Sequence, residues 1–186
     1  MHRGFTVWLT GLSGTGKTTT AYLLEKRLRE TGARVEVLDG DVVRTRLSTG
    51  LGFSKEDRDE NIRRIGFVCE LLSRNGVTVI VAAISPYRAA RDEVRSRVES
   101  FVEVHMQCAL DVLVERDVKG LYQRALAGEL AHFTGISDPY EPPLQPEVTI
   151  DSARETPEAG AGKIWNVLLE RGLVRDDRST LAHQRI

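Results

Sequence analysis

A glycine-rich stretch of eight residues constrains the fold of this chain more than any other feature. It follows directly on an apolar run, Phe5–Leu9, that has the length of a buried strand. Its residues are Gly11-Leu12-Ser13-Gly14-Thr15-Gly16-Lys17-Thr18. The pattern GxxxxGK[ST] is typical of a phosphate-binding loop, because glycine permits the tight turn and the following helix adds a partial positive charge. A plain glycine-rich turn is the alternative, but the flanking strand and helix favour the phosphate loop.

Such a loop binds the phosphates of a nucleoside triphosphate. We expect the ammonium group of Lys17 to lie between the β- and γ-phosphates, and the Thr18 hydroxyl to bind the Mg²⁺ that bridges them. Thr19 completes the set of residues, 11–19, that we expect to contact the donor.

Apolar runs of strand length alternate with helical patterns along the chain. The expected strands span 5–10, 34–38, 77–84, 101–107 and 147–150. The expected helices span 17–30, 55–75, 87–99 and 157–171. Thr156 and Pro157 have the residue types preferred at the start of the last helix. This alternation predicts an α/β fold with a central five-stranded parallel sheet and helices on both faces, a three-layer sandwich.

Composition sets further bounds. The chain has 186 residues, 41% of them hydrophobic, and a formal net charge of −1, so we expect one domain over 1–174 with no general attraction to nucleic acid or membrane. Region 111–146 lacks a strand and is expected to form a lid, and 175–186 a polar tail. We expect no signal peptide and no membrane span. Cys69 and Cys108 lie in apolar segments, which predicts buried, reduced thiols and a cytoplasmic protein.

Two patterns favour a small-molecule kinase among proteins with such a loop. The chain has no Asn-Lys-x-Asp stretch of the kind that GTP-binding switches use to bind guanine. The run 77–84 ends in Ser85-Pro86, without the acidic residue that motor and transport ATPases place there. The expected fold is therefore of the P-loop kinase type.

Two carboxylates follow the second expected strand. Asp39-Gly40-Asp41 would lie at the carboxyl edge of the sheet, beside the phosphate loop. We expect Asp41 to orient the attacking hydroxyl and accept its proton, and Asp39 and Asp41 to assist Thr18 in binding Mg²⁺. The alternative is an Asp-Gly turn that caps the next helix.

Arginines and a phenylalanine follow these carboxylates. Arg44 and Arg58, which share this segment with Phe53 and Asn61, have the chemistry to hold an anionic, aromatic acceptor such as a nucleotide. For Arg46 and Arg64, a solvent-exposed position is the better interpretation.

Six further blocks of sequence follow the glycine-rich loop, in order up to Asp151. They are Asp39-Gly40-Asp41-Val42-Val43-Arg44, Leu51-Gly52-Phe53-Ser54, Glu60-Asn61-Ile62-Arg63-Arg64, Ile84-Ser85-Pro86-Tyr87-Arg88, Lys119-Gly120-Leu121-Tyr122 and Phe133-Thr134-Gly135-Ile136. In their order and spacing these blocks resemble the adenylyl-sulfate kinase family. The resemblance implies transfer of the ATP γ-phosphate, with Mg²⁺, to the 3′-hydroxyl of adenosine 5′-phosphosulfate (APS), giving 3′-phosphoadenosine 5′-phosphosulfate for sulfate assimilation. It also implies a homodimer, and it leaves an ATP sulfurylase open as a partner.

The resemblance also implies roles for residues in the acceptor site. Phe53 and Phe133 would stack on opposite faces of the APS adenine, and the arginines would contact its phosphosulfate. Ser85 matches the serine that the family describes as a phosphorylated intermediate, although direct transfer requires none. The residues expected around APS are Asp41, Arg44, Phe53, Arg58, Asn61, Ile84, Ser85, Lys119, His132 and Phe133.

The chain departs from the family pattern at Val42, Ala83, Val118 and His132. None of the four removes a charged contact. Ala83 and His132 are expected beside the acceptor pocket, which leaves a different nucleotide as an alternative acceptor; a surface position for His132 is the better interpretation. A module that binds ATP without catalysis is the third hypothesis.

Overall fold

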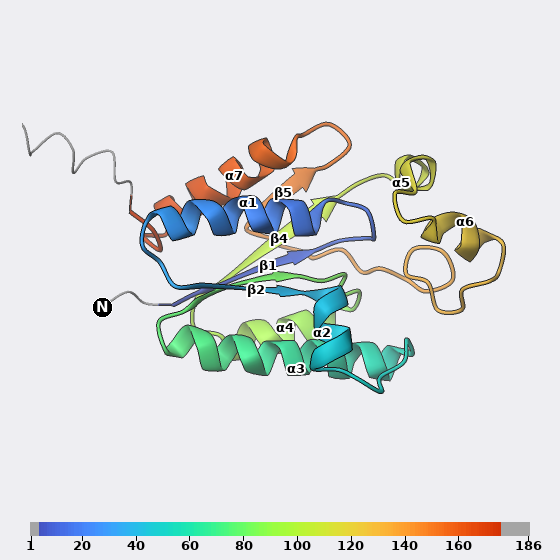
Figure 1. The fold of residues 1–186 in the computed structure, drawn as a ribbon, viewed down its shortest axis with the longest axis horizontal. Helices are drawn as coiled ribbons and strands as arrows, with labels where there is room; N and C mark the ends of the chain where they lie inside the picture. Colours follow the sequence, from blue (N-terminus) through green and yellow to red (C-terminus); the bar gives the residue numbers. More distant parts are fainter. Residues whose placement is uncertain (1–3, 176–186) are drawn as a thin grey trace, which may run out of the picture.

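A computed structural model describes residues 4–175, and its centre is a five-stranded sheet (Figure 1). The strands lie in the order β2-β3-β1-β4-β5, and all neighbours are parallel. Every residue of β1 and β3 is buried, since helices cover both faces of a parallel sheet. The strands are β1 (Thr6–Thr10), β2 (Val35–Asp39), β3 (Thr78–Ala82), β4 (Phe101–Gln107) and β5 (Val148–Asp151).

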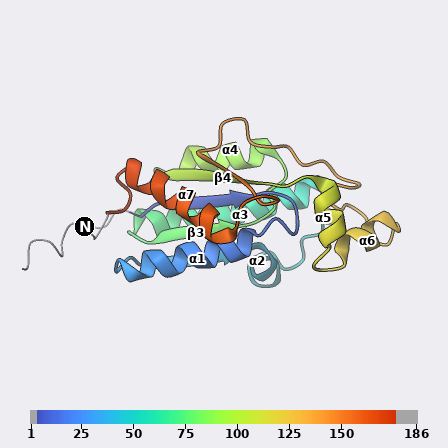
Figure 2. The same ribbon diagram turned by 90° about the horizontal axis from the view of Figure 1, so that it is seen from above.

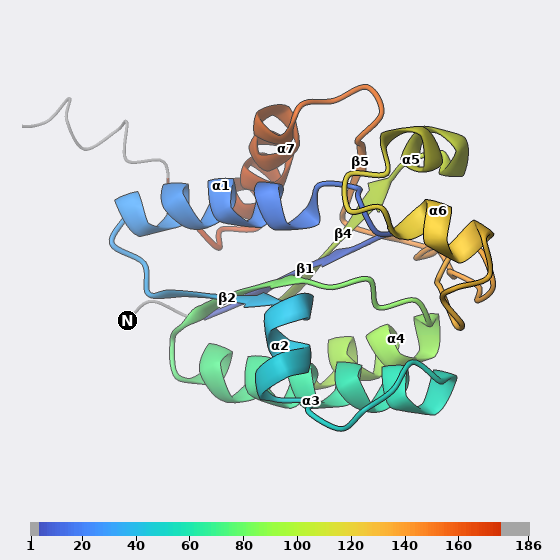
Figure 3. The ribbon, with the colours of Figure 1, turned by 45° about the vertical axis from the view of Figure 1, so that its right-hand side comes forward.

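Helices form a layer on each face of the sheet, as Figures 1 and 2 show. α1 (Lys17–Glu30) and α7 (Pro157–Glu170) cover one face. α2 (Gly40–Arg46), α3 (Lys55–Arg74) and α4 (Arg88–Arg97) cover the other. α5 (Leu110–Arg116) and α6 (Leu121–Leu126) lie beyond the end of the sheet where β1 runs into α1 (Figure 3). The expected three-layer α/β fold is confirmed.

The core consists of two apolar clusters, one on each face of the sheet. Leu24 of α1 and Leu168 of α7 belong to the first, and both are fully buried. Ile65 of α3 and Val94 of α4 belong to the second. α3 and α4 approach closely at Gly66, where an added Cβ would lie 2.5 Å from a methyl group of Val94. Both faces of the sheet are therefore largely apolar, with the buried ion pair between Arg91 of α4 and Glu103 of β4 as an exception.

The observed elements differ from the expected ones mainly at their ends. β2 and β5 begin and end one residue later than expected, and β3 ends two residues before Ile84 because the chain turns at Ser85. The short helix α2 was not expected. Thr156 caps α7 as expected, its Oγ1 accepting a hydrogen bond from the Ala159 amide.

Three further expectations concern membranes, thiols and the tail. Among residues 4–175, no helix is both long and apolar enough to cross a bilayer. Cys69 is a buried free thiol, whose pKa burial raises to about 12, whereas Cys108 is only half-buried. The expected tail, 175–186, lies outside the described residues except for its first residue.

Candidate active site

The glycine-rich loop connects β1 to α1 and wraps around the side chain of Lys17. Lys17 Nζ donates hydrogen bonds to the carbonyl oxygens of Gly11 and Leu12, at 2.9 and 2.6 Å. Gly14 and Gly16 have φ angles of 80° and 82°, a left-handed conformation that glycine adopts without strain. An added Cβ on Gly11 would lie 2.4 Å from the Met106 carbonyl oxygen. The loop thus depends on its glycines and places an ammonium group at its centre.

The environment of Lys17 lowers its pKa to about 7. Desolvation by burial is the largest cause, and the positive charge of Lys119 is the next. Asp41 and Asp39 act in the opposite direction. The charge of Lys17 is therefore incompletely compensated by the protein, and an anionic ligand in the loop would favour the protonated ammonium.

The end of β2 lies beside the start of α1, as the sequence predicts. Thr18 Oγ1 donates a 2.7 Å hydrogen bond to Asp39 Oδ2. Asp39 Oδ1 accepts from the backbone amides of Asp41 and Val42, so Asp39 is also the N-cap of α2. The alternative interpretation of the Asp-Gly stretch, a turn that caps the next helix, is thus confirmed for Asp39, whereas the roles in Mg²⁺ binding and proton transfer stay predictions.

Thr18 and Asp39 provide oxygen donors suited to Mg²⁺. A hydroxyl and one or two carboxylates are enough for this ion in a nucleotide site, since phosphate and water oxygens complete its octahedron. Residues 4–175 contain no cluster of three His, Cys, Asp or Glu side chains that could hold a metal without a ligand. The residues present therefore fit a Mg²⁺ that arrives with a nucleotide.

Asp41 is exposed and forms an ion pair with the candidate lid. Lys119 Nζ lies 2.8 Å from Asp41 Oδ2, and the two side chains are 56% and 82% exposed. Ion pairs this exposed contribute little free energy, so a ligand could displace Lys119 at small cost. Asp41 thus combines a position next to Thr18 and Asp39 with free access for a ligand.

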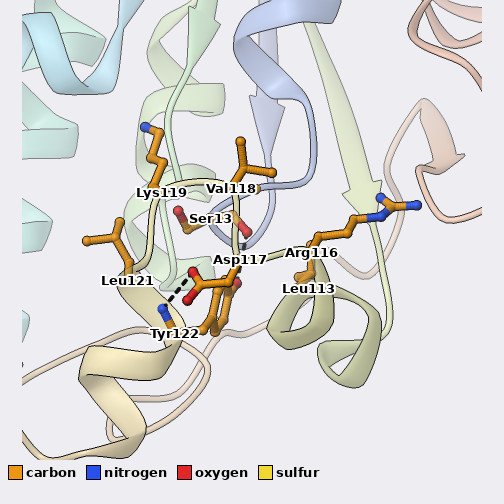
Figure 4. A pocket seen from close by; sticks show the side chains of 9 residues that line it. Ser13, Leu113, Arg116, Asp117, Val118, Lys119, Leu121 and Tyr122 are labelled. Atoms are coloured by element: carbon orange, nitrogen blue, oxygen red, sulfur yellow. Dashed lines mark hydrogen bonds between the residues drawn. The ribbon is translucent and has the colours of Figure 1, made fainter.

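The base of the candidate lid is hydrogen-bonded to the glycine-rich loop, as Figure 4 shows. Tyr122 Oη donates to the Ser13 carbonyl oxygen at 2.8 Å. The Asp117 carboxylate accepts from the backbone amides of Tyr122 and Gln123, both at 3.0 Å, and so fixes the start of α6. The block Lys119–Tyr122 is therefore anchored to the loop.

Two arginines surround Phe53. The guanidinium carbon of Arg44 lies 4.4 Å from the ring centroid of Phe53, and that of Arg58 lies 5.5 Å from it. Arg58 is buried, and its guanidinium group donates to the carbonyl oxygens of Phe53 and His132. Phe53 is 54% exposed, so its aromatic ring, with two cations beside it, is accessible to a ligand. Asn61 is buried, and its Oδ1 has no hydrogen-bond partner within 4–175.

Two residues of the 130s complete this side of the site. Phe133 is half-buried and packs edge-on against Tyr122, with 5.1 Å between the ring centroids. His132 is exposed, and its backbone rather than its imidazole contacts Arg58, which favours the surface interpretation. Val42 and Val118, which also depart from the family pattern, are exposed. Ala83 is buried in the core cluster on the α3 and α4 side of the sheet.

Ser85 lies in a turn between β3 and α4, and its hydroxyl is fully engaged. Its Oγ accepts a 2.9 Å hydrogen bond from Trp8 Nε1 and donates to the Ala83 carbonyl oxygen at 3.1 Å. The side chain is 2% exposed, and φ is 47°. The preceding residue, Ile84, accepts hydrogen bonds from Thr10 Oγ1 and from the Gly11 amide. The turn is thus bonded to the first residue of the glycine-rich loop.

A cavity of about 400 Å³ on the other side of the loop was not expected from the sequence. It is lined by Gly14–Gly16, by Arg116 of α5 and by the loop 152–157 that follows β5. Thr20 Oγ1 and Ser152 Oγ, on residues of its wall, are buried without hydrogen-bond partners in the described part of the chain. The loop 152–157 follows a strand at the carboxyl edge of a parallel sheet, and this position is the signal that could have indicated the cavity.

Comparisons with known proteins agree with this geometry. A family model described as Adenylylsulphate kinase matches residues 3–151. The adenylyl-sulfate kinase of Rippkaea orientalis is 62% identical over 170 residues, which cover 91% of this chain and 94% of that protein.

Two solved structures are also similar. The APS kinase of Mycobacterium tuberculosis in complex with AMPPNP and APS has a TM-score of 0.86 and 41% identity, over 91% of this chain and 99% of that one. A hexameric APS kinase from Thiobacillus denitrificans has a TM-score of 0.72 and 39% identity, over 94% of this chain and 30% of that one. The chain belongs to the adenylyl-sulfate kinase family.

Proposed function

We propose that this protein transfers the γ-phosphate of ATP to the 3′-hydroxyl of APS and so forms 3′-phosphoadenosine 5′-phosphosulfate. One arrangement carries the proposal. The glycine-rich loop lies on one side of Asp41, and the ring of Phe53 with its flanking arginines lies on the other. The chain that has this arrangement belongs to the adenylyl-sulfate kinase family. The relative solved with AMPPNP and APS, at 41% identity, supports a site for two nucleotides.

The donor site comprises residues 11–19 and the cavity beside them. In our proposal the backbone amides of the loop hold the β- and γ-phosphates, and Lys17 moves from the loop carbonyls onto those phosphates. Thr18, with Asp39 and Asp41, would hold Mg²⁺, which neutralises charge on the phosphates when bound. The cavity beside Arg116 has the position and volume for the nucleoside of the donor.

The acceptor site lies on the side of Phe53. The exposed ring of Phe53 would stack on one face of the APS adenine, and Phe133 would cover the other face of the adenine. Asp41 would accept the proton of the 3′-hydroxyl once Lys119 has moved onto the ligand. Ser85 would act by holding its turn in place, since its hydroxyl already has buried partners on both sides. The residues proposed to surround APS are Asp41, Arg44, Phe53, Arg58, Asn61, Ile84, Ser85, Lys119, His132 and Phe133.

A turnover assay with Mg²⁺, ATP and APS tests the proposal, with mass spectrometric identification of the product. We expect Lys17→Ala and Asp41→Ala to lower kcat/KM by at least about 100-fold, the scale of a lost charge-stabilising or proton-accepting group. Lys26→Ala and Asp92→Ala, which remove exposed charges on α1 and α4, are matched controls that should keep wild-type turnover. Product formed from another nucleotide but not from APS would refute the acceptor assignment.

Assembly and cellular context are also proposals. We infer that the chain associates into a homodimer. The hexameric relative supports association between copies in general, though not the dimer specifically. Light scattering on the purified chain tests it, and a monomer at assay concentration would refute it. A cytoplasmic location and an ATP sulfurylase partner stay predictions.

A further inference from the structure

Arg91, a buried residue of α4 outside the site described above, connects the Ser85 turn of that site with the segment around Glu141. Its side chain is 1% exposed, and each of its three nitrogens donates a hydrogen bond. Nη1 donates to the Ser85 carbonyl oxygen at 2.5 Å, and Nη2 to the Glu141 carbonyl oxygen at 2.7 Å. Nε donates to Glu103 Oε1 at 2.8 Å, so a carboxylate of β4 holds the guanidinium group in place. Only a planar fork of donors can reach three separate acceptors in this way.

The first acceptor belongs to a backbone turn that needs support. Ser85 has a φ of 47°, in the left-handed region that a side chain with a Cβ disfavours. Its carbonyl oxygen accepts hydrogen bonds from Arg91 and, at 3.4 Å, from Thr10 Oγ1. The Ile84 carbonyl oxygen accepts from Thr10 Oγ1 and the Gly11 amide. Arg91 therefore stabilises a strained turn that is hydrogen-bonded to the phosphate loop through Ile84 and Gly11.

The second acceptor belongs to the segment that returns from the candidate lid. The Glu141 amide donates to the Pro86 carbonyl oxygen at 2.8 Å, and the Glu141 carboxylate accepts from the Arg88 amide at 2.7 Å. The neighbouring ring of Tyr140 stacks on His105, and its hydroxyl lies 3.0 Å from Thr10 Oγ1. The chain that leaves Phe133 is thus fastened to the same turn that carries Ser85.

We propose that Arg91 is a positioning residue for the acceptor: it sets the Ser85 turn and the return of the lid relative to the phosphate loop, so that APS is held in line with the donor. The inference rests on the proposed function for its substrate. Arg91 has no direct contact with the ligand in this scheme and acts through the backbone of Ser85 and Glu141.

Arg95 provides a matched control within the same ion network. It lies one turn further along α4, pairs with Glu103 Oε2 at 3.0 Å and with Glu147 Oε1 at 2.8 Å, and makes no hydrogen bond to Ser85 or Glu141. Arg91→Lys and Arg95→Lys both keep the positive charge and both weaken the contact with Glu103. Only the first removes the fork that reaches the site.

The experiment measures kcat and KM for both substrates in the two variants, below their melting temperatures. We expect Arg91→Lys to raise KM for APS at least fivefold, with KM for MgATP within twofold of wild type. Arg95→Lys should leave both KM values within twofold. Equal KM values for the two variants, or an equal rise in both KM values of Arg91→Lys, would overturn the proposal.

A spectroscopic readout reports on the turn without catalysis. Trp8 Nε1 donates to Ser85 Oγ, and Trp8 and Trp165 are the two tryptophans of the sequence. In a Trp165→Phe background, Arg91→Lys should shift the emission of Trp8 more than Arg95→Lys does, because Arg95 reaches Trp8 only through the ring of Phe101. An unchanged spectrum in Arg91→Lys would overturn the role of Arg91 in positioning the turn. Failure of the wild-type protein to phosphorylate APS is a separate outcome, and it would refute the proposed function instead.

A second variant covers the case in which Arg91→Lys does not fold. Thr10→Val removes the other side-chain donor to the carbonyl oxygens of the turn and keeps the shape of the buried residue. It should produce the same selective rise in KM for APS, and a folded Thr10→Val protein with unchanged KM would overturn the role of the turn.

Discussion

The pKa of Lys17 makes donor binding depend on pH in a way that can be calculated. With a pKa of about 7 in the free site, about half of the protein carries a protonated Lys17 at pH 7, and about one hundredth at pH 9. If the polyphosphate binds only the protonated form, its apparent Kd should rise about 50-fold between these values, because only the competent fraction binds. Between pH 5 and 6 the Kd should be nearly constant.

Isothermal titration calorimetry with a non-hydrolysable ATP analogue and Mg²⁺ measures this effect. At pH 8 about 0.9 proton should be taken up per nucleotide bound, seen as a difference in heat between buffers of unequal ionisation enthalpy. Lys17→Arg should bind with no such uptake, since a guanidinium group stays protonated throughout. Lys119→Ala should move the transition to higher pH, because Lys119 contributes to the lowered pKa. A Kd that changes less than threefold from pH 7 to pH 9 would refute the reasoning.

The same group affects the stability of the ligand-free protein in the opposite direction. Its folded pKa is below that of the unfolded chain, so the unfolded state binds more protons between pH 7 and pH 10 and stability rises with pH in this window. The total is on the order of 4–5 kcal/mol. Lys17→Met should remove this slope in urea unfolding series, and a slope equal to that of wild type would contradict the assignment.

Three substitutions test other parts of the structure. Phe53→Ala should raise KM for APS about 5- to 150-fold, the equivalent of the ~1–3 kcal/mol of a lost stacking contact, with KM for MgATP unchanged; an equal rise in both would contradict its proposed place in the acceptor site. Arg116→Ala should do the reverse, raising KM for MgATP alone, and unchanged nucleotide binding would exclude the cavity as the nucleoside site. Gly66→Ala should lower the free energy of unfolding by about 1–3 kcal/mol through the clash with Val94, with kcat near wild type; unchanged stability would contradict that packing.

Local chemistry explains which parts of the fold could be predicted. The glycine-rich loop and the cap at Thr156 are determined by neighbouring residues, and both occur where the sequence places them. The runs now seen as β1 and β4 are predictable because a doubly covered sheet needs continuous apolar strands. The helix α2 was missed because its seven residues, Gly40–Arg46, are too few for a periodic pattern.

The contacts of the site were harder to predict, because they join segments that lie far apart in the sequence. The position of Asp39 beside Thr18 follows from the rule that parallel strands end at one edge. The bond from Tyr122 to Ser13 spans 109 residues, and that from Arg91 to Glu141 spans 50. No local pattern marks such pairs, which depend on tertiary packing. The Ser85 hydroxyl is likewise enclosed because Trp8 Nε1 donates a hydrogen bond to it, and the sequence indicates for Trp8 only a position in a buried strand.

The central strand β1 has a consequence for how two substrates are kept apart. It leads directly into the phosphate loop, and two of its own side chains, Trp8 and Thr10, donate to the Ser85–Ile84 turn on the acceptor side. The proposed spacing between donor and acceptor is therefore set inside one fully buried strand of five residues. Opening and closing of α5 and α6 would alter access and solvation, while the distance over which the phosphoryl group travels would stay the same.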